Sequence, residues 1–297
     1  MFLDSLSRST LFFKIAFTAF DLCTGLFLFL FLRKTNESTH RVFIYLWNPL
    51  ALVSFSLDGH LDSLAICLVC ASLYLFALER KPASIALLSL SFISKLFSIV
   101  LLPFFIQRSE KKYALTLLFL IVAAIFFPWY FRGGWNSLEG LWLYSAHWRF
   151  NDSLFMIVDA WCDFLGLRYL SDMPFFSSAL PRAMIAVFYS AAMAYFAWKK
   201  KEVSLLRISY WSMGLLLLLS PTLHFWYLTW MLPFLVFFPN RAWILLTGAI
   251  MLSQEVLTGY SLRGVWVEKG WIKLMEFLPF YLLLFFDYII IVNAKNK

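Results

Sequence analysis

Two carboxylates and an imidazole lie within five residues in the segment SFSLDGHLDSL, between two apolar stretches. Gly59 permits a tight turn here, and Asp62 falls where a helix with free N–H groups would begin. Asp58 and Asp62 could together hold a divalent metal ion. Alternatively, one carboxylate could act as a general base while His60 contacts a phosphate. A simpler reading is that Asp62 caps the helix, and that Asp58 and His60 are solvated turn residues.

Lys95 lies near the middle of an apolar stretch at 83–106, in SFISKLFSIVLLPFF. A charge at membrane depth costs about 3 kcal/mol on insertion scales. We therefore expect two short helices, roughly 83–94 and 96–106, that enter and leave by one membrane face and meet at Lys95 in a polar cavity. The alternative is a single tilted helix in which Lys95 snorkels or pairs with an acid. If Lys95 binds phosphate, Lys95→Met should still fold.

Two later segments add possible donors. His147, Arg149 and Asn151 lie in AHWRFND, and His224 follows Pro221 in SPTLHFWYLTWMLPF. Arginine binds phosphate through its planar fork. The flanking Trp and Tyr side chains could stack on sugar rings, but an aromatic belt at the membrane surface explains them more simply. Together with Lys95, these residues indicate recognition of an anionic phosphate beside a hydroxyl acceptor.

The composition is that of a polytopic membrane protein. The 297 residues are 62% hydrophobic, 20% aromatic and only 14% charged, with a mean hydropathy of +0.77. Soluble domains are about 25% charged, and a soluble fold could not hide 34 Phe and 13 Trp from water. The net charge of +8 resides in short basic clusters between apolar segments. That pattern follows the positive-inside rule and does not indicate nucleic-acid binding.

The apolar segments predict an all-α membrane protein with about nine transmembrane helices plus the re-entrant hairpin at Lys95. Residues 1–297 form a single domain, with the N-terminus outside and the C-terminus in the cytoplasm. An outer-face segment at about 131–181 includes a surface helix at 154–167, with Asp159 and Asp163 facing water. The predicted apolar segments are 11–32, 42–57, 61–78, 83–106, 113–130, 182–198, 205–220, 225–239, 242–257 and 272–293.

The order of four segments resembles the GT-C class of membrane glycosyltransferases, and within it the polyprenyl-phosphate-mannose-dependent mannosyltransferases. The segments are WNPLALVSFSLDGHLDSLAICLVC, ALLSLSFISKLFSIVLLPFF, HWRFNDSLF and SPTLHFWYLTWMLPF. The resemblance covers roughly residues 12–240. The residues that match its motifs are Asn48, Pro49, Gly59, His60, Asp62, Lys95, Pro103, Trp148 and Asn151.

The resemblance implies transfer of a hexose, with mannose expected, from a polyprenyl-phosphate donor on the extracytoplasmic face of a bacterial inner or plasma membrane. The acceptor would be a glycan, glycolipid or protein. In an inverting reaction a base deprotonates the acceptor hydroxyl, which attacks the anomeric carbon while cations stabilise the leaving lipid phosphate. The catalytic candidates are Asp58 and Asp62. The candidates for binding the lipid phosphate are His60, Lys95, His147, Arg149, Asn151 and His224.

The chain departs from the class at its start. Members usually begin with an extra helix and a large outer loop that carries the catalytic aspartate. Here only MFLDSLSRST precedes the first apolar segment, and Asp4 is its one acid. A shortened member, a fragment and a non-catalytic subunit of a transferase complex all fit this pattern. A transporter or flippase would also keep charges at membrane depth, but its repeats should give paired broken helices. The sequence has no second copy of the Lys95 hairpin.

Overall fold

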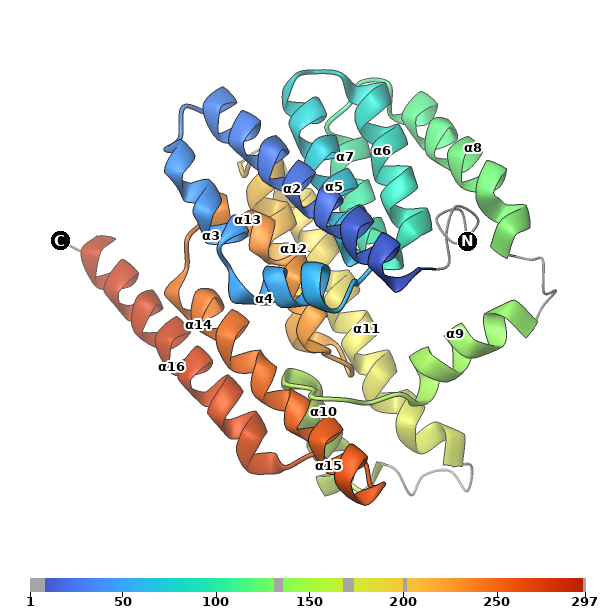
Figure 1. The fold of residues 1–297 in the computed structure, drawn as a ribbon, viewed down its shortest axis with the longest axis vertical. Helices are drawn as coiled ribbons and strands as arrows, with labels where there is room; N and C mark the ends of the chain where they lie inside the picture. The colour runs from blue at the N-terminus through green and yellow to red at the C-terminus, as the bar shows by residue number, and fades with distance from the viewer. Residues whose placement is uncertain (1–8, 131–135, 168–173, 200–201, 296–297) are drawn as a thin grey trace.

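The computed structural model describes residues 9–130, 136–167, 174–199 and 202–295, and in these ranges every regular element is a helix (Figure 1). The all-α prediction is therefore confirmed for this part of the chain. The longer helices are α2 (Thr10–Lys34), α5 (Asp62–Ala77), α6 (Lys81–Ser94), α8 (Lys112–Tyr130), α9 (Asn136–His147), α10 (Leu154–Phe164), α11 (Pro174–Trp198), α12 (Leu205–Leu219), α14 (Arg241–Ala249), α15 (Glu255–Arg263) and α16 (Gly270–Lys295).

Within the described ranges, three helices are long and apolar enough to cross a membrane. They are Thr10–Lys34, Ala179–Trp198 and Arg241–Arg263. Four further apolar helices are shorter, namely Asp62–Ala77, Lys81–Ser94, Leu96–Gln107 and Leu205–Leu219. These helices support a membrane protein, but the predicted count of nine spans is not confirmed.

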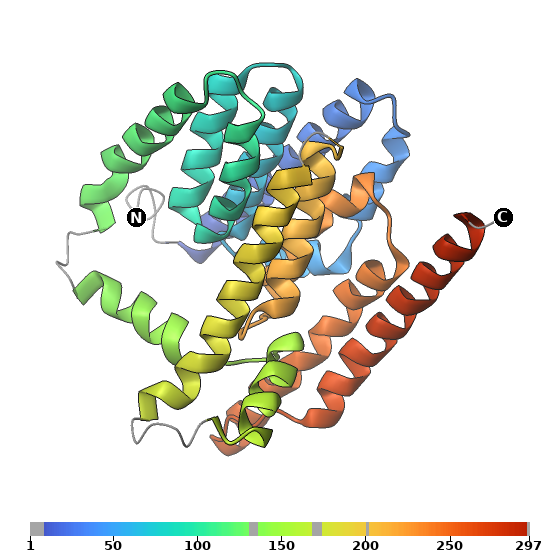
Figure 2. The same ribbon diagram turned by 180° about the vertical axis from the view of Figure 1, so that it is seen from behind.

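One row of helices packs side by side in the order α2, α5, α6 and α8. The turns at 78–80 and 108–111 both lie at the upper edge of Figure 1, and Figure 2 shows the same row from behind. Helices α14, α15 and α16 form a second group, with α10 near its lower end (Figure 1). The long helix α11 runs past α12 at the back of the molecule.

The predicted helix break at Lys95 is present. Helix α6 ends at Ser94, and Lys95 has an extended backbone with φ −155° and ψ 128°. The chain then resumes as the 3-10 helix η3 (Leu96–Leu101) and α7 (Leu102–Gln107). Pro103 lies in the first turn of α7, where its missing N–H leaves no hydrogen bond unmade. A charged residue therefore separates two short apolar helices, as the sequence predicts.

The predicted apolar segments at 42–57 and 225–239 are each divided into shorter pieces. Asn48 caps the start of the piece that follows it by accepting a hydrogen bond from Leu50 N at 3.0 Å, with Pro49 as the first residue of that helix. The Asn48 amide also donates to Thr247 Oγ1 at 3.0 Å, which ties this corner to α14. The pieces are η1 (Thr39–Val42), α3 (Phe43–Leu46), α4 (Pro49–Ala51), the π-helix η2 (Leu52–Leu57), the 3-10 helix η6 (Phe225–Trp230) and α13 (Leu232–Phe237).

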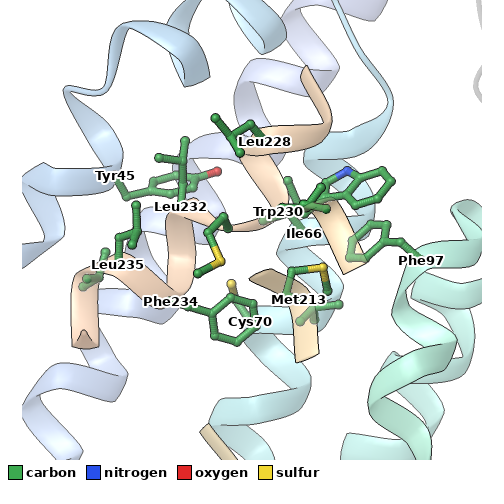
Figure 3. Packing of buried hydrophobic residues seen from close by; sticks show 14 of the residues in the cluster. Tyr45, Ile66, Cys70, Phe97, Met213, Leu228, Trp230, Leu232, Phe234 and Leu235 are labelled. Carbon is green, nitrogen blue, oxygen red and sulfur yellow. The ribbon is translucent and has the colours of Figure 1, made fainter. Parts of the chain in front are cut away.

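The core joins these short pieces to the longer helices. Figure 3 shows Tyr45 of α3, Ile66 of α5, Phe97 of η3, Met213 of α12 and Trp230 of η6 in one cluster. All five are buried. Because packed side chains fix the backbone that carries them, the core holds η3, which follows Lys95, in a fixed position against η6.

Candidate active site around Lys95 and Asp62

An ion pair connects the two polar motifs that the sequence singles out. Lys95 Nζ lies 3.2 Å from Asp62 Oδ2, and the Asp62 side chain is only 1% exposed, whereas that of Lys95 is 30% exposed. The indole of Trp230 donates to Asp62 Oδ1 at 2.6 Å. The N-cap of α5 is Leu61, and Asp62 is the first residue of the helix with its carboxylate bound to Lys95 and Trp230, so the reading of Asp62 as a simple cap is wrong. The alternative of a single tilted helix predicts that Lys95 pairs with an acid, and this pair is present. The helix is nevertheless broken at Lys95.

Lys95 lies at the wall of an apolar cavity of about 680 Å³. It is the one charged residue among the described residues that line this cavity. Its ammonium lies 5.2 Å from the centroid of the Tyr227 ring, within range of a cation–π contact. The other lining residues are Ser94, Leu96, Phe97, Ile99, Val100, Leu141, Tyr144, Ser145, Leu216, Leu217, Ser220, Pro221, Thr222, Tyr227 and Trp230. The cavity thus combines one cation with a long apolar wall, which suits an anionic amphiphile.

Stacked rings fix the surroundings of Lys95. Tyr227 stacks on Trp230 at 4.6 Å between centroids, and Trp230 stacks on Phe97 at 4.3 Å. The Tyr227 hydroxyl shares a hydrogen bond of 2.8 Å with the Tyr144 hydroxyl of α9. Four segments that are distant in sequence therefore meet at the ion pair, and Trp230 contributes both packing and a hydrogen bond.

The turn between η2 and α5 requires a glycine. Gly59 has φ +72°, and a Cβ atom there would lie 3.3 Å from Cγ of Lys14 in α2. A side chain at position 59 would therefore be strained by its backbone and crowded by Lys14. Lys14 was not among the predicted site residues, because its place in the first apolar segment gives no sign that α2 begins beside this turn.

The two catalytic candidates lie in different environments. Asp58 is exposed at the turn, and its carboxylate makes no hydrogen bond or ion pair with the residues that the structure describes. Asp62 is buried, and both of its oxygens are engaged by Lys95 and Trp230. Asp58 is thus free to accept a proton from a substrate, whereas Asp62 is placed to orient Lys95.

Two of the three predicted histidines, His60 and His224, lie in one column of rings. Trp226 lies between them, with its ring 4.1 Å from His60 and 4.3 Å from His224. Phe150 stacks on the far side of His224 at 4.9 Å. The column brings the turn at 58–61, the start of η6 and the loop after α9 together. Belt residues would face lipid, so the belt explanation is wrong for the buried Trp230. Trp226 is half-buried, and its place in an aromatic belt stays a prediction.

Burial lowers the pKa of both imidazoles. The pKa of His60 is lowered by burial, and Lys95 adds to this effect, while Asp62 and Asp58 oppose it. Burial lowers the pKa of His224 to about 4, with a further contribution from the charge of Lys95. At neutral pH His224 is therefore an uncharged ring. Lys95 then supplies the positive charge of this site, and the histidines can supply neutral N–H donors.

Arg149 and Asn151 belong to a different cluster. Arg149 forms ion pairs with Asp152, at 2.8 Å, and with Asp159. The buried Asn151 donates from its side chain to Glu276 at 2.7 Å. The prediction that Asp159 faces water is wrong, because its carboxylate turns inward to Arg149 and is only 8% exposed. The helix predicted at 154–167 is present as α10, Leu154–Phe164, and on it Asp163 is exposed.

This second cluster positions the ring column. Phe150 N donates to Pro221 O at 3.1 Å, and Leu223 N donates to Phe150 O at 2.8 Å. The short bridge ties the loop after α9 to the segment that carries His224. His147, at the end of α9, is exposed. The structure therefore joins His60, Asp62, Lys95 and His224 at one site, while Arg149, Asn151 and His147 lie outside it.

A divalent metal between Asp58 and Asp62 stays a prediction. The described part of the chain holds no group of three or more His, Cys, Asp or Glu side chains arranged for a metal ion. Asp62 already gives one oxygen to Lys95 and the other to Trp230. Asp62 is therefore arranged like a carboxylate that orients Lys95 and not like a metal ligand.

The first third of the chain matches the model of a known protein family. Residues 8–109 match the model of the MptA_B family, described as alpha-(1->6)-mannopyranosyltransferase, N-terminal domain. The match supports a mannosyltransferase family. It includes Asp58, His60, Asp62 and Lys95 and ends before the η6 segment with His224. Searches of curated proteins and of solved structures gave no match.

Proposed function

We propose that this protein is a GT-C-type membrane mannosyltransferase that transfers mannose from a polyprenyl-phosphate donor to a hydroxyl group on the extracytoplasmic face. The main support is the position of Lys95, which is the single charged residue among the described residues at the wall of an apolar cavity of about 680 Å³. A polyprenyl phosphate is an apolar chain with one anionic group at its end. The match of residues 8–109 to a mannosyltransferase family supports mannose as the sugar.

Lys95 is suited to hold the phosphate of such a donor. An ammonium group has three N–H donors, and only one is directed to Asp62. The side chain is 30% exposed and borders the cavity, so a second anion can approach it. The buried Asp62, held by Trp230, fixes the direction of the ammonium before the donor arrives. Preorganised cations of this kind stabilise charge that develops on a leaving group.

The proposed reaction assigns the general base to Asp58. Its exposed carboxylate takes the proton of the acceptor hydroxyl. The acceptor oxygen then forms a bond to the anomeric carbon while the bond from that carbon to the phosphate oxygen breaks. The polyprenyl phosphate leaves with the bonding electrons, and Lys95 stabilises its added negative charge. His60, two residues from Asp58, can donate a neutral N–H to the sugar or the phosphate.

The basic clusters support an extracytoplasmic site. Arg80 and Lys81 lie at the turn before α6, and Arg108, Lys111 and Lys112 lie at the turn after α7. Both turns lie at the upper edge of Figure 1, at the opposite ends of α6 and α7 from Lys95. Because such clusters remain in the cytoplasm, Lys95 and the turn at 58–61 should open to the other side.

The experiment is a transfer assay with purified protein. Radiolabelled mannose is supplied either on a polyprenyl phosphate or on a nucleoside diphosphate, with an α-1,6-linked mannose disaccharide as acceptor. We expect labelled product from the lipid donor and none from the nucleotide donor. Product from the nucleotide donor alone, or from neither donor, would contradict the proposal. A flippase would move the lipid donor across vesicles and form no new glycosidic bond.

A further inference from the structure

A second, smaller cavity of about 270 Å³ lies beside the Lys95 cavity. Four of its lining residues come from one stripe of α11, at the i, i+3, i+4 and i+7 positions of a helix face. They are Arg182, Ile185, Ala186 and Tyr189. The two cavities share wall residues from α9 and from the end of α12, among them Ser145 and Pro221. This second cavity has a cation at one end and an apolar floor.

One nitrogen of the Arg182 guanidinium has no hydrogen-bond partner. Its Nε donates to Ala146 O at 2.7 Å, and its Nη2 donates to Trp148 O at 3.1 Å. Nη1 is buried and has no hydrogen-bond partner in the structure. An unpaired buried donor is costly, and an anionic oxygen would satisfy it. The guanidinium also lies 5.3 Å from the ring of Phe155, which lines the same cavity.

The charge of Arg182 is also incompletely balanced. Asp152 and Asp159, the two acids whose charges act on Arg182, form their ion pairs with Arg149. Asp152 additionally binds Lys273 at 2.7 Å. Among the described carboxylates none forms a hydrogen bond with Arg182, whose two bonded partners are neutral carbonyls. The cavity is therefore complementary to a negative group at its Arg182 end.

The position of Arg182 on α11 identifies the class of ligand. Arg182 is the one charged residue within the candidate span Ala179–Trp198 of α11 and lies toward its N-terminal end, so an uncharged stretch of the helix follows it. A cation in this position lies near the membrane–water interface, where lipid phosphates are found. Ile185, Ala186 and Tyr189 continue from it along the span. We infer that this cavity binds an anionic phospholipid, with the phosphate at Arg182 and an acyl chain along α11. The inference does not depend on the transferase activity.

The test fills the cavity without touching the cation. Ala186→Trp places a large ring on the floor, and Ala186 does not line the Lys95 cavity. The matched control is Val187→Trp, one residue along on a side chain that is 71% exposed. Native mass spectrometry of the detergent-purified protein measures the binding of phosphatidylglycerol, phosphatidylcholine and inorganic phosphate. No sugar donor is present, so the measured lipid binding does not depend on whether the protein is a transferase.

We expect wild type and Val187→Trp to bind one phosphatidylglycerol about tenfold more tightly than phosphatidylcholine, a difference of about 1.4 kcal/mol. Ala186→Trp should lose that bound lipid. Arg182→Gln, which keeps a donor for the end of α9 and removes the charge, should lose the preference for the anionic lipid. Equal binding of the two lipids by wild type would overturn the inference. So would full binding by Ala186→Trp, or displacement of the lipid by inorganic phosphate at similar concentration.

Discussion

Trp230 holds Asp62 from the side opposite Lys95, because its indole nitrogen donates to Oδ1 at 2.6 Å while Lys95 approaches Oδ2 at 3.2 Å. A buried carboxylate fixed by two donors cannot rotate away when a second anion approaches. In the proposed reaction, the ammonium of Lys95 therefore keeps its position when the donor phosphate binds. This three-residue arrangement connects α5, the helix break at Lys95 and η6.

The ion pair makes Lys95 important for folding. Lys95→Met leaves the buried Asp62 without its cation, and breaking a buried pair costs about 3–5 kcal/mol. We expect the low end of that range, because Lys95 is partly exposed and Trp230 still binds Asp62. Adding Asp62→Asn removes the unpaired charge and keeps the acceptor for Trp230. Melting temperatures in detergent should fall for Lys95→Met and recover in the double variant. Equal melting of wild type and Lys95→Met would show that the pair contributes nothing.

Trp230→Phe separates the hydrogen bond from the stacking. Phenylalanine can still stack on Phe97 and Tyr227, but Asp62 Oδ1 loses its donor. Hydrogen bonds to charged groups contribute about 1.5–3 kcal/mol, so the variant should unfold at a lower denaturant concentration. Trp211→Phe is the control, since Trp211 is a partly exposed tryptophan of α12. If both variants lose the same stability, packing alone would explain the role of Trp230.

Asp58→Asn tests the proposed base. Because Asp58 is exposed and unpaired in the described structure, the variant should keep the stability of wild type. Its turnover should fall by about 100-fold or more, the usual contribution of a general base, with little change in KM for the lipid donor. Asp163→Asn, at an exposed position on α10, is the control. Turnover near that of wild type would exclude Asp58 as the base.

The histidine column predicts a pH dependence of stability. His224 has a pKa of about 4 in the folded protein, below its ordinary value near 6.5. Between these values the unfolded chain binds a proton that the folded protein does not bind, so stability is full above about 6.5 and falls as the pH drops toward 4. Melting temperatures measured from pH 7.5 to 4.5 should decline in wild type and decline less in His224→Gln. Parallel curves would contradict this assignment.

The hairpin can be tested by labelling. Glu110 is exposed at the turn after α7, whereas Ser109 beside it is buried, so cysteine is placed at 110. Gly140 on α9 has no neighbour within 4 Å of an added Cβ. In intact cells, a membrane-impermeant thiol reagent should label cysteine at 140 and spare cysteine at 110. Labelling at both positions would show that the turn after α7 and helix α9 do not lie on opposite membrane faces.

Local sequence predicts some of this site well. A lysine in the middle of an apolar segment is costly in a continuous helix, and the chain indeed breaks at Lys95. Gly59 predicts a turn, and the turn has the positive φ that only glycine adopts easily. These features depend on residues within a few positions of one another, so the sequence pattern contains the necessary information.

Contacts between distant segments could not be predicted in this way. Trp230 and Asp62 are separated by 168 residues, and nothing in FWYLTW distinguishes a buried indole from one in an aromatic belt. Arg149 resembles a phosphate-binding residue in sequence, yet Asp159, ten residues later, turns inward to pair with it. Asp159 was expected on the wet side because an amphipathic pattern does not show where an opposite charge will lie.

The Lys95→Met/Asp62→Asn double variant tests whether Lys95 binds the phosphate of a polyprenyl-linked mannose. This variant removes the cation without leaving a buried charge, so folding and function can be separated on one sample. The measurement is mannose transferred per folded molecule, with Asp62→Asn as the matched control. The loss of one transition-state donor costs about 2.7–4 kcal/mol, so we predict turnover roughly 100- to 1000-fold below that of Asp62→Asn. Equal turnover of the two variants would show that Lys95 does not bind the donor phosphate.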